Sequence, residues 1–135
     1  MTVSLPLERK VKFYGSSNLK QWELLSEFGP AGAVKGIWEC PDLFQLEIEG
    51  THQSKWVLIV NVGSESIAGG SGCQYFVGDF DGVQFVVDSE LPSSNASAEP
   101  ANWVDHGKDF YAAVSWSDIP KEDGRRLWLG WLSNW

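Results

Sequence analysis

Glu39 carries a carboxyl group, and its neighbours in the sequence would suit acid–base chemistry. It lies in the segment Trp38-Glu39-Cys40-Pro41, where an indole ring and a thiol flank it. Apolar surface beside a carboxyl group disfavours the charged form and raises its pKa, and a general acid must hold its proton near neutral pH. An ordinary exposed glutamate on a β-strand could have the same neighbours, so the local pattern leaves both interpretations open.

The cysteines and histidines show no recognisable constellation. Cys40 and Cys73 cannot form a disulfide framework, and they lack the paired spacing of metal ligands. We therefore expect no metal and no cofactor, and we expect Cys40 to be a packed thiol rather than a nucleophile. His52 and His106 have no metal-type ligands as partners, so a surface position is expected for both.

The chain contains eight tryptophans among its 135 residues. The flat faces of these rings could stack on sugar rings, but each ring also buries a large apolar area, so we expect most of them in the core. With 10 basic and 18 acidic residues the net charge is −8, which argues against nucleic acid and anionic membranes as partners. A neutral small molecule such as a sugar is compatible with this charge.

The length is enough for one domain. No apolar run approaches the ~20 residues that a transmembrane helix needs, and Met1–Lys12 lacks the apolar stretch of a signal peptide. The sequence therefore predicts a soluble protein without an export signal in this chain, and it does not indicate a compartment.

Short β-prone runs between turn signals make up most of the chain. Near Pro41 we expect a bulge or a strand start, because proline cannot donate a hydrogen bond to a neighbouring strand. Asp81-Gly82 is a tight-hairpin signal, since glycine accepts a positive φ, and Ser89–Asn102 has the composition of a surface loop. The spacing in Leu19–Phe28 would permit a helix, although not a convincing one. Strands are expected at Val11–Tyr14, Gly36–Glu49, Trp56–Val62, Cys73–Phe80, Val83–Asp88, Lys108–Trp116 and Arg126–Trp131.

The four consecutive strands between residues 36 and 88, followed by a loop and more strands, have the rhythm of a β-propeller blade. A β-sandwich has the same rhythm, so periodicity does not decide between the two. Composition and pattern by themselves predict an all-β domain.

Three stretches carry a resemblance to a known family. They are Trp38-Glu39-Cys40-Pro41-Asp42-Leu43-Phe44, then Tyr75–Gly82 with Phe85, then Asp105–Ala112 with Leu129–Trp135. In this order and at these intervals they resemble glycoside hydrolase family 32, which includes invertases, levanases and inulinases. A supporting match is the segment Ser16–Trp22, so the similarity spans about Val11 to Trp135.

The resemblance implies part of a five-bladed β-propeller, about two blades of four-stranded antiparallel sheet. Residues 11–35 would end one blade, residues 36–88 would form a full blade, and residues 103–135 would begin the next, all within one partial domain of residues 1–135. It also implies hydrolysis of terminal β-fructosyl bonds with retention. The expected ligand is sucrose or a fructose-containing oligosaccharide.

The resemblance assigns roles to individual residues. Glu39 would be the general acid/base. Asp105 and Lys108 match a segment that lies near bound sugar in the family. The alternative interpretation is that the two residues form a solvated pair in a turn. Trp131 would line the pocket or pack in the core, and Asp42 would orient the loop beside Glu39 or cap a turn.

The sequence departs from the family pattern at the nucleophile. No W-M-N-D-P-N-G-like motif and no R-D-P motif occurs, and Glu99-Pro100 is the only Asp/Glu-Pro step. Retaining hydrolysis needs two carboxyl groups ~5–5.5 Å apart, so we expect this chain alone to be inactive. The alternative is a non-catalytic carbohydrate-binding or scaffold module. Two blades leave apolar faces and strand edges open, so we expect self-association or completion by the missing propeller segments.

Overall fold

The central sheet is built from strands that carry apolar side chains on both faces. The computed structural model describes residues 1–88, 100–120 and 122–132. In it, the central sheet contains β4 (Trp38–Glu47), β5 (Ser54–Val62), β6 (Gly72–Phe80) and β7 (Phe85–Val87) as antiparallel neighbours in chain order. The short β8 (Asn102–Trp103) pairs with β6 on the edge that β7 also uses.

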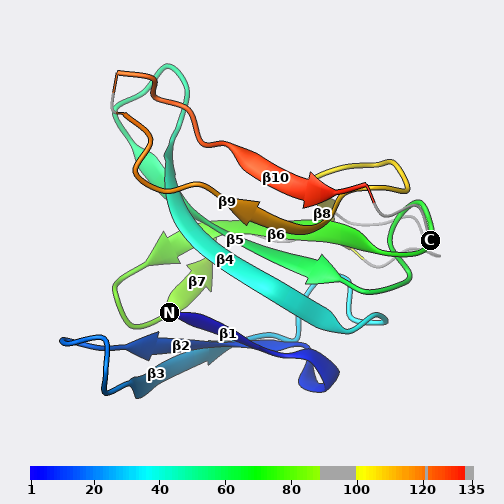
Figure 1. The fold of residues 1–135 in the computed structure, drawn as a ribbon, viewed down its shortest axis with the longest axis horizontal. Helices are drawn as coiled ribbons and strands as arrows, with labels where there is room; N and C mark the ends of the chain where they lie inside the picture. Colours follow the sequence, from blue (N-terminus) through cyan, green and yellow to red (C-terminus); the bar gives the residue numbers. More distant parts are fainter. Residues whose placement is uncertain (89–99, 121, 133–135) are drawn as a thin grey trace.

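Two smaller sheets cover the two faces of the central sheet, so the fold has three layers (Figure 1). One is the antiparallel sheet of β1 (Thr2–Leu5), β2 (Lys10–Gly15) and β3 (Glu23–Phe28), with a 3₁₀ turn at Pro6–Glu8. The other is the hairpin of β9 (Tyr111–Ser115) and β10 (Trp128–Trp131).

The alternation along β5 explains why both faces are covered. Leu58, Val60 and Val62 pack with residues of β2, whereas Val57 and Ile59 pack towards β9. Successive side chains of a strand point to opposite faces, so one apolar strand contributes side chains to two cores. Each fully buried aliphatic side chain of this kind stabilises the fold by about 1.5–3 kcal/mol.

The predicted strands are all found, with shifted ends. The possible helix at Leu19–Phe28 is wrong, because Glu23–Phe28 is β3 and pairs with β2. Tertiary pairing overrides the local spacing here: Phe28 packs against the central sheet, while Glu27 bonds to Lys10 and Lys12 on the outer side. The predictions did not include β1 or β8.

Two loop predictions have different outcomes. The Asp81-Gly82 hairpin is confirmed, with Gly82 at φ +95° and the Asp81 carboxylate accepting from the backbone N–H groups of Val83 and Gln84 at 2.8 and 2.7 Å. Of the predicted loop 89–102, residues 89–99 lie outside the described residues, and Asn102 belongs to β8.

The expectation that most tryptophans lie in the core is confirmed for the described residues, because four of their seven tryptophans belong to the two cores or pack against them. Of the described ones, Trp38 is fully buried, and Trp56, Trp103 and Trp128 are half-buried. The exposed ones are Trp22, Trp116 and Trp131. The outcome depends on which sheet faces have a covering layer, which the local sequence does not reveal.

The division of the chain into parts of three blades remains a prediction. Among the described residues, we find no helix that could span a membrane. The same part of the chain brings no three His, Cys, Asp or Glu side chains into a metal-binding group.

Candidate functional site

A β-bulge places two carboxyl groups of β4 on the same face. Glu39 pairs with Asn61, and Asp42 pairs with Ile59. The two residues of β4 between Glu39 and Asp42 therefore lie opposite a single residue of β5. Residues three positions apart in a regular strand point to opposite faces, and the extra residue cancels that reversal. Glu39 and Asp42 therefore both point towards β9, and the bulge predicted near Pro41 is confirmed.

The bulge is held from the side of β1 as well. The Thr2 hydroxyl donates to the Pro41 carbonyl oxygen at 3.0 Å, and the Ser4 hydroxyl donates to the Trp38 carbonyl oxygen. On the inner side the indole N–H of Trp38 donates to Ala33 at 2.7 Å. Both backbone and side-chain partners thus fix the segment that carries Glu39.

Glu39 is half-buried and bonded to Tyr111, the first residue of β9. The Tyr111 hydroxyl donates a hydrogen bond to Oε2 of Glu39. Burial, followed by this bond, raises the pKa of Tyr111, so the phenol stays protonated and remains a donor at neutral pH. An ordinary exposed strand glutamate would lack such a partner, and the bond fixes the orientation of the Glu39 carboxyl group.

Cys40 is the bulged residue and is exposed, so the expectation of a packed thiol is wrong. Its φ of 43° breaks the pleat and turns its side chain away from the core. Burial of part of the thiol, followed by the charge of Glu39, raises the pKa of Cys40, which disfavours a reactive thiolate. Cys73, in contrast, is buried in the core between the central sheet and β9.

Asp42 links β4 to β9 rather than capping a turn. Its Oδ2 accepts from the Ser115 backbone N–H at 3.1 Å and from the Ser115 hydroxyl. The same hydroxyl accepts from Nη2 of Arg126 at 2.6 Å, and the Arg126 guanidinium lies 4.3 Å from the centroid of the Phe44 ring. Asp42, Ser115 and Arg126 form a continuous polar chain across the two sheets.

Asn61 is a site residue that the sequence-based reasoning missed. It is fully buried, its Nδ2 donates to the Cys40 carbonyl oxygen at 3.1 Å, and its Oδ1 accepts from the Ala113 N–H at 3.2 Å. The side chain therefore ties the bulge to β9. The signal was a single amide in the otherwise apolar run Trp56–Val62.

The remaining predicted site residues lie near the same end of the sheets. Trp131 pairs with Tyr111, and Val104, which precedes Asp105, donates its N–H to Cys73 at 2.9 Å. Asp105 is exposed, and its Oδ1 accepts from the Gly107 N–H at 2.7 Å within its own turn. Lys108 is also exposed, which agrees with the alternative of a solvated turn pair.

Trp131 is 71% exposed, so the alternative of a core position is wrong. It lines a pocket of about 280 Å³ on the outward face of β9 and β10. Its neighbours there are Ala112, Val114, Leu129 and Gly130.

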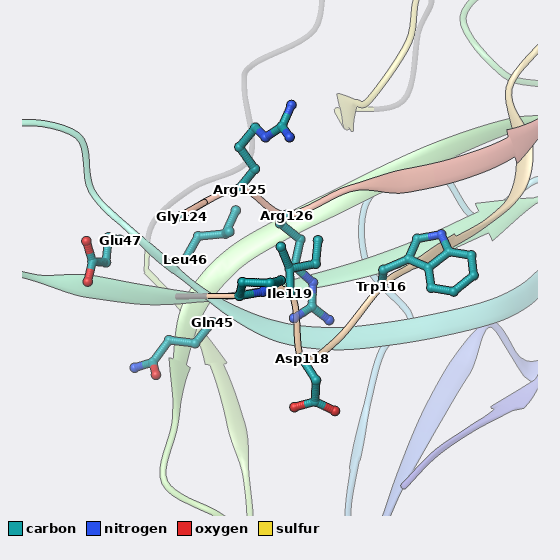
Figure 2. Close-up of a pocket in the computed structure, with 10 residues that line it drawn as sticks. Gln45, Leu46, Glu47, Trp116, Asp118, Ile119, Gly124, Arg125 and Arg126 are labelled. Atoms are coloured by element: carbon teal, nitrogen blue, oxygen red, sulfur yellow. The ribbon is translucent and has the colours of Figure 1, made fainter. Parts of the chain in front are cut away.

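Two larger pockets lie elsewhere. One of about 520 Å³ is bordered by Tyr14, Trp22 and Asp42. The other, of about 380 Å³, lies at the opposite end of β4 from Glu39, beside Glu47 and Trp116 (Figure 2). Glu39 lines none of the three pockets described here.

Comparisons with known proteins give one consistent result. The levanase of Bacillus subtilis (strain 168) is 56% identical over 128 residues, which are 93% of this chain and 18% of the levanase. The extracellular exo-inulinase of Aspergillus niger is 44% identical over 128 residues, which are 93% of this chain and 23% of that protein.

Solved structures agree with these sequence matches. The exo-inulinase of Aspergillus awamori superposes with a TM-score of 0.85 at 38% identity, over 97% of this chain and 25% of that one. The β-fructofuranosidase of Schwanniomyces occidentalis complexed with fructosyl-erythritol has a TM-score of 0.84 at 43% identity, over 98% of this chain and 23% of that one. The chain thus spans between 18% and 25% of the length of these relatives.

The prediction of an all-β fold that is part of a β-propeller is confirmed by these structures. The family model described as the glycosyl hydrolases family 32 N-terminal domain matches residues 1–135. The chain therefore belongs to glycoside hydrolase family 32.

Proposed function

We propose that this chain contributes the general acid/base, Glu39, to a retaining β-fructosidase that hydrolyses terminal β-fructosyl bonds in sucrose, levan or inulin. The observation that carries the proposal is the position of Glu39. Its carboxyl group is half-buried, lies on a bulge and is oriented by Tyr111. Membership of the family and the names of the relatives, levanase and exo-inulinase, support the substrate class.

In this proposal, Glu39 acts twice. It first donates its proton to the oxygen that leaves the fructosyl group, and it then takes a proton from the water that releases the product. Tyr111 and the bulge hold the carboxyl group in one orientation, which is a requirement for proton transfer over hydrogen-bond distance.

The proposal assigns the other predicted residues to sugar binding. The carboxylate of Asp105 and the ammonium group of Lys108 can bond sugar hydroxyls, and the exposed ring of Trp131 can pack against a sugar face. The bonds of Asp42 to Ser115 give it a positioning role, because they hold β9 and therefore Tyr111 against β4.

We propose that this chain alone does not turn over these substrates. The reaction also needs a nucleophilic carboxylate ~5–5.5 Å from the acid/base. Asp42 shares a face with Glu39 but is engaged by both donors of Ser115, and these 135 residues contain no W-M-N-D-P-N-G-like segment. Assays of the purified chain with sucrose, levan and inulin are expected to show no hydrolysis. Turnover that Glu39→Gln abolishes would contradict this part.

The proposed role of Glu39 can be tested by exchange with the levanase. The 128 aligned residues of the Bacillus subtilis enzyme are replaced by those of this chain. The chimera is expected to hydrolyse levan, and Glu39→Gln is expected to reduce kcat by about 10²–10⁴-fold. A Glu49→Gln chimera, at an exposed glutamate that lines none of the three pockets described above, is the matched control. An active chimera in which both variants behave alike would overturn the assignment.

The alternative is a non-catalytic carbohydrate-binding or self-associating module. The observation that favours it is the outward face of β9 and β10, where Val114, Leu129 and Trp131 are exposed. Apolar sheet faces of this kind promote association. Sedimentation at micromolar concentration tests it: concentration-dependent association supports the alternative, and a monodisperse monomer contradicts it.

A further inference from the structure

The pocket of about 380 Å³ at the far end of β4 joins two separate parts of the fold (Figure 2). One wall comes from the end of β4, and the other comes from the connector between β9 and β10. Its volume lies within the ~300–1,000 Å³ that is usual for ligand pockets. Glu39, Tyr111 and Asn61 take no part in it, so the proposed reaction does not account for it.

The walls of this pocket are anchored to the core. Arg126 is fixed by its hydrogen bond to Ser115 and by its position over the Phe44 ring. The Trp116 backbone N–H donates to the Leu127 carbonyl oxygen at 2.9 Å, which extends the β9–β10 ladder to the pocket. The Trp116 indole is nevertheless 61% exposed. A rigid backbone therefore presents a free aromatic face.

The arrangement of side chains suits a ligand with both hydroxyl and C–H surface. In Figure 2, Leu46, Ile119 and Arg126 lie at the centre of the group, and the polar side chains are arranged around them. Gln45, Glu47 and Asp118 supply oxygen acceptors, and Gln45 also supplies an amide donor. Two aliphatic side chains and one guanidinium group at the centre, a few polar groups around them and one exposed aromatic ring can bind a sugar.

The charges of the pocket disfavour an anionic ligand. The carboxylates of Glu47 and Asp118 balance the guanidinium groups of Arg125 and Arg126 in formal charge. Arg125 is already paired, because its Nη2 lies 2.7 Å from Oδ2 of Asp123. With Arg125 neutralised by that pair, Glu47, Asp118 and Arg126 leave one net negative charge, so the pocket does not select an anion and a neutral ligand is compatible with it.

We propose that this pocket binds a neutral fructan chain at a point remote from Glu39 and serves as an anchoring site for the polymer. The choice of fructan among neutral saccharides rests on the proposed function, whereas the pocket and its chemistry do not. A polymer held at two points of one protein binds more tightly than at either point alone, because the second contact is intramolecular.

The experiment uses the purified chain and short levan and inulin oligosaccharides. Binding is measured by calorimetry, and the indole N–H signals of Trp116 and Trp131 are followed by NMR. The variants are Trp116→Ala, Trp131→Ala as a matched exposed tryptophan, and Glu39→Gln. Maltooligosaccharides of the same length serve as the specificity control.

We expect the Trp116 signal to shift with fructan, and Trp116→Ala to lower the affinity by roughly tenfold or more, as is common for an aromatic ring that becomes buried by its binding partner. Trp131→Ala and Glu39→Gln should leave the Trp116 shift intact. The inference is overturned if fructan leaves the Trp116 signal unmoved, or if Trp116→Ala and wild type bind equally. A shift confined to Trp131 would overturn it while supporting the proposed function, so the two failures are distinguishable.

Discussion

Both faces of the central sheet have an apolar core, and they differ in the balance between aromatic packing and side-chain hydrogen bonds to the covering sheet. On the face towards β1–β3, Phe28 lies edge-on to Phe76 and Phe85, with ring centroids 4.9 and 5.3 Å apart, and Trp38 is fully buried beside them. On the face towards β9, Phe44 and Trp128 also pack edge-on with ring centroids 5.4 Å apart, and side-chain hydrogen bonds of β4 and β5 reach across to the covering strand. These hydrogen bonds join Glu39 to Tyr111, Asp42 to Ser115 and Asn61 to Ala113.

This difference distinguishes contacts that stabilise the domain from contacts that orient Glu39. Aromatic packing is strong and tolerant of small rotations, whereas hydrogen bonds fix angles and leave costly unpaired groups when they are broken. The candidate acid/base lies on the hydrogen-bonded face. We infer that the face towards β1–β3 mainly stabilises the domain and that the face towards β9 mainly orients Glu39.

The largest expected effect comes from the aromatic face. Phe76→Ala should lower the free energy of unfolding by about 3–5 kcal/mol, because a buried ring is replaced by a cavity. Urea denaturation measures the change, and Val86→Ala, at an exposed position of β7, is the control that should stay within about 0.5 kcal/mol. If Phe76→Ala lowers the free energy of unfolding by less than about 1 kcal/mol, the stabilising role of this face is contradicted.

A smaller loss is expected from the hydrogen-bonded face. Asn61→Ala leaves the Ala113 N–H and the Cys40 carbonyl group without their partner, which should lower the free energy of unfolding by about 2–3 kcal/mol. The exposed amide variant Gln45→Ala is the matched control. If Asn61→Ala and Gln45→Ala have equal stability, Asn61 does not tie the bulge to β9.

The Tyr111 bond should contribute less, with a defined pH dependence. Tyr111→Phe is expected to lower the free energy of unfolding by about 1 kcal/mol at pH 7. The pKa of Tyr111 is raised in the folded chain, so above pH ~10 the unfolded chain loses the phenolic proton first and wild-type stability falls. The free energy of unfolding of Tyr111→Phe should fall less steeply above that pH. If the free energies of unfolding of wild type and Tyr111→Phe fall in parallel from pH 9 to 11, the bond to Glu39 is contradicted.

The smallest effect is expected outside both cores. Lys12 and Glu27 form an ion pair on the outer side of β2 and β3, with 3.3 Å between Nζ and Oε1. Exposed pairs contribute about 0–1 kcal/mol and weaken with salt. Lys12→Ala should therefore change the urea midpoint slightly, and molar salt should abolish the difference. A loss as large as that of Asn61→Ala would contradict the comparison.

Much of the fold was predictable because it depends on local pattern. Alternation along residues 57–62, the hairpin signal at Asp81-Gly82 and the bulge near Pro41 are all encoded within a few residues. β3 was ambiguous, because only its pairing with β2 decides between a strand and a helix.

The partners within the candidate site were less predictable. Glu39 could be identified from its motif, but its partner Tyr111 lies 72 positions further along the chain. Ser115 lies 73 positions beyond Asp42. Such contacts depend on how the sheets stack, and the exposure of Trp116 and Trp131 depends on the same stacking.

The most direct test of Glu39 compares two substrates in the levanase chimera. A proton donor matters for sucrose, whose leaving oxygen must be protonated, and matters little for an aryl β-fructofuranoside with an acidic phenol as leaving group. We expect Glu39→Gln to reduce kcat/KM for sucrose by about 10²–10⁴-fold and to leave kcat/KM for the aryl substrate far less affected. We compare kcat/KM because the later step, in which water releases the fructosyl group, is common to both substrates and also uses Glu39. Equal losses of kcat/KM on both substrates would contradict the role of Glu39 as the proton donor.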